Sequence, residues 1–337
     1  MRSVGVFFAL IVQFCSFNQL AEGQQEQYVA GDWWQQQQDE AFDIRQHYNY
    51  KLLPPKDKCG LATEQRIIGG YLTELGQIPW IARIAFAKNK ALRRRMNSNR
   101  KISDNLVTFS CGGSLISKYY VVTAAHCTLG PADILFVRLG EWDVDTDPDC
   151  QNGVCAPLVQ DITVVDVISH KFYSNDEHMK NDIALLRLEK PPILNRYVQP
   201  ICLPYGPALT RDFTGEDTIV AGWGLTETDA PSTMLLAVQQ TVYDNDRCLQ
   251  VYADNNINVR YRDGQMCVGG IIGKDSCNGD SGGPLLWTGS FDRELSARTY
   301  LIGLVSLGPA SCGVHEIPGV YTRTAFFMKW ILDNMRE

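Results

Sequence analysis

Apolar residues occur in short runs along most of the chain, and the runs are separated by Gly, Pro, Asn and Asp. Short apolar runs between such turn-forming residues are typical of β-strands. The runs that we expect to form strands are 80–86, 114–116, 120–125, 134–139, 183–188, 218–221, 301–306 and 319–321. Many short strands with frequent turns predict an all-β protein, built as a sandwich or a barrel.

The C-terminal segment follows a different period. Its large apolar residues recur every three to four positions, and they are Phe326, Phe327, Trp330, Ile331 and Met335. This spacing places them on one face of a helix. We therefore expect an amphipathic helix over residues 325–335.

Residues 1–23 have the pattern of a secretory signal. Arg2 precedes an apolar run from Val4 to Phe14, and Ala21-Glu22-Gly23 resembles a cleavage site. The run is too short to span a bilayer. We expect a secreted, extracellular protein without a membrane span.

Residues 24–58 differ from the rest of the chain. They are rich in glutamine (Gln35 to Gln38 are consecutive), contain no cysteine and show no sustained period. Such a composition is typical of disorder, so we expect this segment to be mostly unstructured.

Composition narrows the choice of function. The 337 residues carry a formal charge of −7, which argues against a general nucleic-acid-binding protein. Of the 11 cysteines, Cys15 lies in the expected signal, which leaves an even number. In a secreted chain this implies a disulfide framework, although spacing alone leaves the pairing open. No CxxC pair is present, which argues against a zinc site.

The segment Gly279-Asp280-Ser281-Gly282-Gly283-Pro284 suggests a nucleophile. Its three glycines permit a tight turn that a substrate can approach closely. A serine becomes a nucleophile when a base lies beside it and donors stabilise the oxyanion that it creates.

Two other segments offer a base and an orienting group. His126 ends the apolar run from Val121, and Asp182 opens the apolar run 183–188. A carboxylate at the end of a buried strand needs a polar partner, and a histidine N–H is a suitable one.

The sequences TAAHC, DIALL and GDSGGP, in this order, resemble those of the trypsin/chymotrypsin family of serine proteases. The resemblance covers the chain from about Cys59 to the C-terminus and implies two six-stranded antiparallel β-barrels with a C-terminal α-helix. It assigns His126 as general base, Asp182 as its orienting partner and Ser281 as nucleophile. The N–H groups of Gly279 and Ser281 would form the oxyanion hole, and the chemistry would need no cofactor.

The same resemblance implies a binding site for Arg or Lys. Asp275 stands where the family has the floor of its primary pocket, six residues before the nucleophile. The other expected substrate-binding residues are Ser276, Ser306, Gly308 and Gly319, with Ser306 also supporting Asp182. The chain departs from the family at Leu307, where tryptophan is usual, which leaves the shape of the neighbouring subsites open.

Arg66-Ile67-Ile68-Gly69-Gly70 resembles the activation junction of the family. Cleavage after Arg66 would free the Ile67 amine to pair with Asp280 and order the site, so the intact chain would be a zymogen. The expected domains are a signal (1–23), a propeptide (24–66) and a protease domain (67–337).

The family also suggests how the cysteines pair. The implied disulfides are Cys59–Cys202, Cys111–Cys127, Cys150–Cys155, Cys248–Cys267 and Cys277–Cys312. The first would tether the propeptide to the protease domain. This tether and the Cys150–Cys155 loop look most like invertebrate clip-domain cascade proteases of innate immunity (melanisation, clotting or Toll activation). Those proteases carry a six-cysteine clip module, which residues 24–58 do not match.

The implied partners are protein substrates that are themselves zymogens, an upstream activating protease and serpin-type inhibitors. Two other functions are compatible with parts of the sequence. A digestive trypsin is disfavoured by the long tethered propeptide, and a non-catalytic protease homologue by the presence of Ser281.

Two charged loops leave alternatives open. Glu141, Asp143, the Thr146 carbonyl and Asp149 could bind Ca²⁺, since the family has a calcium loop here, or they could form a solvated acidic loop. The segment Lys88–Lys101 has seven Lys or Arg and no acid. It could bind an acidic partner, or it could be an exposed loop open to proteolysis.

Overall fold

The computed structural model describes residues 43–61, 71–89, 103–130, 132–174, 179–226, 230–255, 264–271, 279–291, 296–308 and 316–337. All of these residues except Asp43 belong to the unit Ile44–Glu337. Several expectations fall outside the described residues. They concern the signal, most of the propeptide, Arg66, Ile67, Asp275, Ser276, Cys277–Cys312 and nearly all of the Lys88–Lys101 loop.

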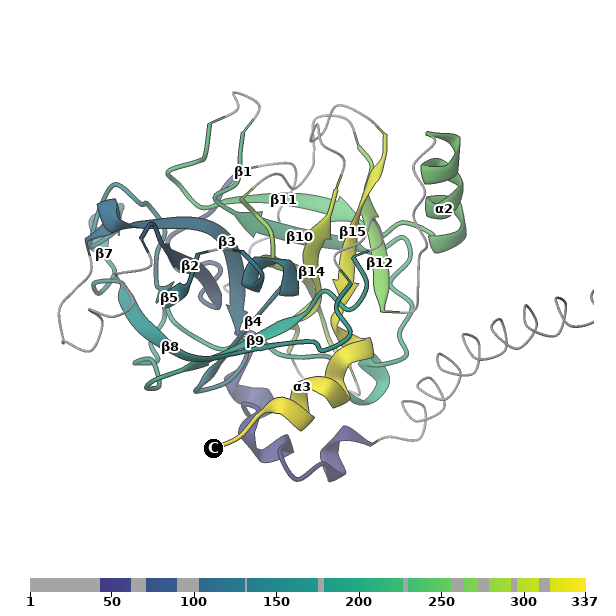
Figure 1. The fold of residues 1–337 in the computed structure, drawn as a ribbon, viewed down its shortest axis with the longest axis horizontal. Helices are drawn as coiled ribbons and strands as arrows, with labels where there is room; N and C mark the ends of the chain where they lie inside the picture. The colour runs from purple at the N-terminus through teal and green to yellow at the C-terminus, as the bar shows by residue number, and fades with distance from the viewer. Residues whose placement is uncertain are drawn as a thin grey trace, which may run out of the picture. The chain divides into compact units, whose positions relative to one another are not determined.

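Six strands between Ile81 and Leu188 close into an antiparallel barrel (Figure 1). Its order is β2-β3-β4-β9-β8-β5. The strands are β2 (Ile81–Ala87), β3 (Val107–Leu115), β4 (Tyr120–Thr123), β5 (Ile134–Leu139), β8 (Gln160–Ser169) and β9 (Ala184–Leu188). Alternate residues point inward, so that Ile84, Val121, Val137, Ile162 and Leu186 form one buried core.

The six strands from β10 to β15, together with β1, form a seven-stranded sheet in the order β1-β11-β10-β13-β14-β15-β12. Its strands are β1 (Tyr71–Leu72), β10 (Asp217–Gly222), β11 (Leu236–Thr241), β12 (Gln265–Gly269), β13 (Pro284–Gly289), β14 (Arg298–Leu307) and β15 (Pro318–Arg323). An isolated bridge between Val242 and Val268 joins the β11 end of the sheet back to β12. The all-β, two-barrel expectation is confirmed, with β1 as an additional strand.

The remaining strands and α-helices of the described residues are short. They are the hairpin β6 (Cys150–Gln151) and β7 (Val154–Cys155), α2 (Asn245–Asp254) and α3 (Met328–Asn334). The expected C-terminal helix begins as a 3₁₀ turn, Thr324–Phe327, and continues as α3, with Ile331 and Leu332 buried. The other 3₁₀ turns are Ile44–Gln46, Tyr50–Leu52, Lys56–Lys58, Asp104–Leu106, Ala125–Thr128 and Gly206–Ala208. Within the described residues, no helix has the length and apolar character to cross a membrane.

Four of the five implied disulfides are present: Cys59–Cys202, Cys111–Cys127, Cys150–Cys155 and Cys248–Cys267. Around the first of them, the Gly60 N–H donates to the Pro200 carbonyl, and the Gly60 carbonyl accepts from the Thr299 N–H. The segment around Cys59 is therefore attached to the second barrel by backbone hydrogen bonds as well as by the disulfide.

The expectation of disorder over residues 24–58 is wrong for residues 44–58. These residues form three 3₁₀ turns that pack beside α3 (purple and yellow in Figure 1). Ile44 is buried, and the Asn49 side chain donates to the carbonyls of Leu332 and Met335, at 2.9 and 2.5 Å. Composition did not reveal this because the contact satisfies carbonyls at a helix C-terminus, which the helix itself leaves without donors.

Substituting Asn49 tests how much this contact contributes. We expect Asn49→Ala to lower the free energy of unfolding by about 1–3 kcal/mol, because two buried carbonyls lose their donor. Chemical denaturation of the Ser281→Ala protein, with and without the substitution, would measure the difference. Lys51→Ala is the matched control: it removes only an exposed ion pair with Glu337 and should change little. Equal effects of the two substitutions would contradict the assigned role of Asn49.

His170 gives the fold a pH dependence. It is buried against Phe327 and Trp330, and burial, with a smaller effect of the nearby Lys171 charge, lowers its pKa to about 4. In the unfolded chain His170 binds a proton near pH 6.5, whereas in the folded protein it stays neutral down to about pH 4. The folded state therefore has its full stability with respect to His170 above pH 6.5 and loses stability as the pH falls towards 4. We expect a loss of about 3 kcal/mol over this range. Unfolding measured from pH 4 to 7 should show a shallower slope in His170→Gln, and an unchanged slope would contradict the assignment.

Candidate active site

The first barrel brings His126 and Asp182 together through the pairing of two strands. Thr123, the last residue of β4, pairs with Ala184, the first residue of β9. The residues just after β4 and just before β9 therefore lie side by side. His126 follows β4 in a 3₁₀ turn, and Asp182 precedes β9.

Asp182 is 1% exposed and accepts hydrogen bonds from three donors. The His126 backbone N–H lies 2.8 Å from Oδ1, and His126 Nδ1 lies 2.8 Å from Oδ2. The Ser306 hydroxyl donates to Oδ2 at 2.5 Å. Because a carboxylate only accepts, Nδ1 carries the imidazole proton, and in the neutral ring the lone pair is then on Nε2. His126 is thus arranged as a base.

Ser281 lies in a turn that the glycines make possible. Gly279 and Gly282 have φ of +103° and +72°, in the region that other residues rarely adopt. A Cβ at Gly282 would lie 2.2 Å from the Thr123 hydroxyl oxygen, so a side chain there is excluded. The turn ends at Pro284, where β13 begins.

Hydrogen bonds across the two barrels position this turn against the His126 region. The Gly112 N–H of β3 donates to the Ser281 carbonyl at 2.8 Å, and Cys127 Sγ lies 3.7 Å from the same oxygen. From the second barrel to the first, the Thr322 hydroxyl of β15 donates to the Asp182 carbonyl at 2.7 Å, and the Ser306 hydroxyl of β14 donates to the Asp182 carboxylate. Residues of both barrels therefore meet at this site.

Asp280 is enclosed by the segment that follows β10. Its Oδ1 accepts from the Gly224 N–H at 2.9 Å. A Cβ at Gly222 or Gly224 would lie 2.1 or 2.5 Å from the nearest Asp280 oxygen. Asp280 thus occupies space that only glycine leaves open, and its position is coupled to that of its neighbours Gly279 and Ser281.

The expected pocket residues are described only in part. Gly308 follows β14, and Gly319 lies in β15. Because Leu307 of β14 pairs with Val320 of β15, both glycines lie at the same end of this strand pair. Among the described residues, no heavy atom lies within 4 Å of a Cβ built on Gly308.

The acidic loop places two arginines beside Glu141, the first of the expected calcium ligands. Glu141 is buried, and its Oε2 lies 3.5 Å from Arg138 and 3.9 Å from Arg83, two cations that would repel Ca²⁺. Asp149 Oδ2 accepts from the Trp142 N–H, and Asp149 Oδ1 accepts from the Thr146 hydroxyl. Asp143 accepts from the backbone of Asp145. Asp143 and Asp149 are thus used within the protein, while Glu141 Oε1 is buried without a hydrogen-bond partner among the described residues.

One group of metal-ligand side chains is close together in the described part of the chain: Cys111, His126 and Cys127. Its two sulfurs form a disulfide with each other and are not free to bind a metal.

Sequence reasoning missed Gly222, Gly224 and Thr322. The glycines accommodate Asp280, and the Thr322 hydroxyl holds the Asp182 backbone. The segment Gly222-Trp223-Gly224 carried a signal, because two glycines at the end of a strand indicate a close approach of another group.

Comparison with known proteins identifies the family. The trypsin family profile matches residues 67–331. The CLIP domain-containing serine protease HP8 of Bombyx mori is 40% identical over 293 residues, covering 85% of this chain and 74% of the relative. Phenoloxidase-activating factor 3 of Holotrichia diomphalia is 40% identical over 84% of this chain and 76% of its own length.

A solved structure agrees with these relatives. The Grass clip serine protease of the Drosophila Toll pathway has a TM-score of 0.68 at 31% identity, covering 83% of this chain and 75% of its own. Sequence, fold and the arrangement of His126, Asp182 and Ser281 lead to the same conclusion: the chain belongs to the trypsin family of serine proteases.

Proposed function

We propose that the chain is the secreted zymogen of a serine endopeptidase that is activated by cleavage after Arg66. The active enzyme cuts protein substrates after Arg or Lys in an extracellular cascade. The observation that carries the catalytic part is the buried Asp182 carboxylate, which orients His126 through two hydrogen bonds.

In this mechanism the Ser281 hydroxyl attacks the scissile carbonyl while His126 Nε2 takes its proton. The imidazolium that forms is stabilised by Asp182, whose charge is held in place by His126 and Ser306. The N–H groups of Gly279 and Ser281 stabilise the oxyanion, where removal of one donor costs about 3–4 kcal/mol. His126 then gives its proton to the leaving amine, and water repeats the sequence to release the acyl group.

Activation acts through Asp280. The Ile67 amine, freed by cleavage, pairs with the Asp280 carboxylate and orders the neighbouring N–H groups of Gly279 and Ser281. The tight enclosure by Gly222 and Gly224 supports this role, since a displaced Asp280 displaces the turn that holds Ser281. The Cys59–Cys202 disulfide would keep the propeptide attached after cleavage.

The cascade assignment is supported by the names of the relatives. They include a phenoloxidase-activating factor of Holotrichia diomphalia and, from Drosophila melanogaster, a Spaetzle-processing enzyme and a melanization protease. We infer that this chain acts on a protein zymogen in a pathway of the same kind, and that an upstream protease specific for basic residues activates it.

Activity before and after cleavage tests the proposal. The secreted protein would be treated with a protease that cuts after Arg66, and the new N-terminus at Ile67 confirmed by mass spectrometry. We expect hydrolysis of a short arginyl amide only after cleavage, and none with the cleaved Ser281→Ala protein or with Arg66→Gln, which cannot be cut at this junction. An intact chain as active as the cleaved one would contradict the zymogen assignment. A cleaved chain without activity would favour a non-catalytic homologue.

A further inference from the structure

The residues just after the activation junction are held by the second barrel. Tyr71 and Leu72 form β1, which pairs with β11. Thr73 is fully buried, and its N–H and its hydroxyl both donate to the Leu235 carbonyl, at 3.1 and 2.8 Å. In the sequence, only residues 67–70 lie between the cleavage point and β1. The segment between the new N-terminus and its first paired residue is therefore short.

The loop between β5 and β8 of the first barrel also contacts this segment. Trp142 Nε1 donates to the Thr73 carbonyl at 2.9 Å. The side-chain carbonyl of Gln151 accepts from the Leu75 N–H at 3.1 Å. Asp149, which precedes β6, accepts from the Trp142 N–H through Oδ2. The two side chains that hold the segment are thus joined within one loop.

The hairpin that carries Gln151 is closely constrained. Cys150 pairs with Cys155 across β6 and β7 and forms a disulfide with it. The two residues of the turn, Asn152 and Gly153, have φ of +51° and +78°, as a two-residue hairpin turn of this kind requires. The disulfide and the tight turn leave the backbone of this hairpin few alternative conformations. The position of the Gln151 side chain is therefore well defined.

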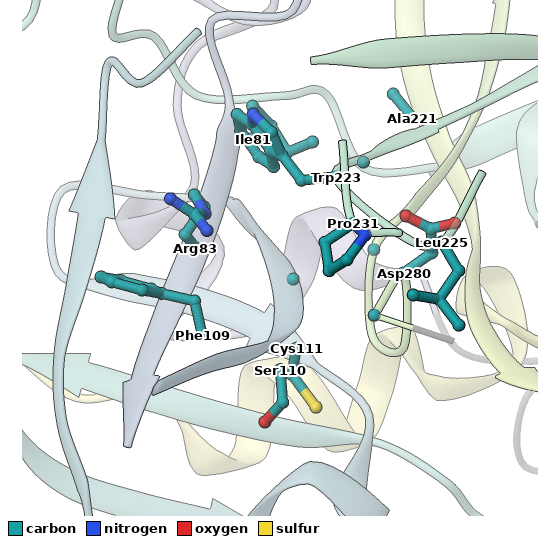
Figure 2. Close-up of a pocket in the computed structure, with 14 residues that line it drawn as sticks. Ile81, Arg83, Phe109, Ser110, Cys111, Ala221, Trp223, Leu225, Pro231 and Asp280 are labelled. Carbon is teal, nitrogen blue, oxygen red and sulfur yellow. The ribbon is translucent and has the colours of Figure 1, made fainter. Parts of the chain in front are cut away.

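The Trp142 end of the loop is connected to Asp280. The Trp142 carbonyl accepts from the Leu235 N–H at 2.8 Å and from Trp223 Nε1 at 3.3 Å. Gly224, the neighbour of Trp223, donates its N–H to Asp280. Trp223 and Asp280 line the same cavity of about 270 Å³ (Figure 2). The anchored part of the activation segment and the proposed partner of its amine thus belong to one hydrogen-bonded framework.

We propose that Gln151, held by its disulfide hairpin, is a positioning residue for activation that strengthens the pairing of the Ile67 amine with Asp280. The inference rests on the proposed cleavage after Arg66. Ordering a flexible residue costs conformational entropy, so a short free segment loses less of it when the amine pairs. Without the Gln151 acceptor, the residues around Leu75 would also have to be ordered in that step, and the pairing would weaken.

The reactivity of the Ile67 amine measures this pairing. Cyanate carbamylates only the unpaired amine, so the rate in the cleaved protein, followed by mass spectrometry of the N-terminal peptide, reports the unpaired fraction. We expect Gln151→Ala to raise this rate about 3- to 10-fold, the scale of one uncharged hydrogen bond. The alkaline limb of kcat/KM should move to lower pH by about 0.5 to 1, the logarithm of that factor, because weaker pairing leaves the amine closer to its ordinary pKa of about 7.7–8.0.

Gln160→Ala is the matched control. The Gln160 side chain lies in the same barrel and makes two hydrogen bonds with the Ile193 backbone, at 2.9 and 2.8 Å, outside the activation segment. With both variants shown to be folded by thermal unfolding, Gln160→Ala should keep the carbamylation rate and the alkaline limb of the unmodified enzyme. Equal effects of the two substitutions would reduce Gln151 to a stabilising residue and overturn the proposal, as would an unchanged rate in Gln151→Ala.

Opening the hairpin tests whether the disulfide acts through Gln151. Replacing Cys150 and Cys155 together by serine should raise the carbamylation rate, and should add little when Gln151→Ala is already present. A full additional increase in the combined variant would contradict the role of the hairpin.

The unmodified cleaved protein separates this inference from the proposed function. Its Ile67 amine should react more slowly than that of a free peptide beginning Ile-Ile-Gly-Gly. If it does, and the enzyme hydrolyses an arginyl amide, an unchanged rate in Gln151→Ala rejects the positioning role alone. An amine as reactive as that of the peptide would reject the proposed activation itself.

Discussion

Replacing Asp182 by Asn should lower kcat by about 10⁴-fold, the loss given by the equivalent substitution in the family's template enzyme. In this structure the reason is the number of donors that converge on the carboxylate. The His126 N–H, the His126 ring and the Ser306 hydroxyl all donate to it. An amide offers one oxygen and an NH₂ group that can only donate. If its NH₂ faces the ring, His126 must carry its proton on Nε2 and can no longer act as a base.

Steady-state hydrolysis of an arginyl amide by the cleaved protein measures this effect, with kcat and KM determined separately. Ser306→Ala is the matched comparison, because it removes one of the three donors and keeps the carboxylate. We expect its loss of kcat to be about 10- to 100-fold, the scale of one hydrogen bond to a charged group. If Asp182→Asn cost no more than Ser306→Ala, Asp182 would not be setting the His126 tautomer.

A methyl group at position 224 should lower kcat/KM by about 10²-fold or more, the scale of losing one oxyanion donor. The Cβ of Gly224→Ala would lie between 2.5 and 2.7 Å from three atoms of the Asp280 carboxyl group. Because the strand β10 and the segment after it are fixed by pairing, Asp280 is the group that has to move. The adjacent N–H groups of Gly279 and Ser281 then leave the positions needed for the oxyanion.

Gly130→Ala is the control for this substitution. The nearest atom to a Cβ at Gly130 is 4.0 Å away, so its activity should match that of the unmodified enzyme. Thermal unfolding of both variants would distinguish a displaced site from a destabilised fold. Full activity in a folded Gly224→Ala protein would show that Asp280 is not coupled to the oxyanion donors.

The sequence predicted the strands best where both faces of the strand are buried. The run 134–139 coincides with β5, in which every residue is buried. The pattern of apolar runs did not predict β8. Val165 and Val167 in this strand are 47% and 38% exposed, so apolar and polar residues do not alternate between its two faces. Helix α2 was missed because only Cys248 and Tyr252, one turn apart, are buried in it.

The candidate site could be predicted because three local segments each carry a distinctive motif. What those segments could not reveal are contacts between residues far apart in the chain. Thr322 and Asp182, which share a hydrogen bond, are separated by 140 positions. The sequence of β2 likewise does not show that Arg83 packs against both Phe109 of the first barrel and Trp223 of the second. Such contacts depend on how the barrels meet, which no local period encodes.

The docking of residues 44–58 on α3 has a consequence for the enzyme that the proposed cleavage after Arg66 would produce. Only seven positions separate Cys59 from Arg66, so the severed end could extend no more than about 25 Å from the disulfide. Asn49 attaches the same segment to α3 at a second place. While either the disulfide or the Asn49 contact is intact, the partners of the other stay close together at a high effective concentration. Reduction of the disulfide alone should therefore leave the two chains associated, and a partner bound to the N-terminal chain would remain with the enzyme.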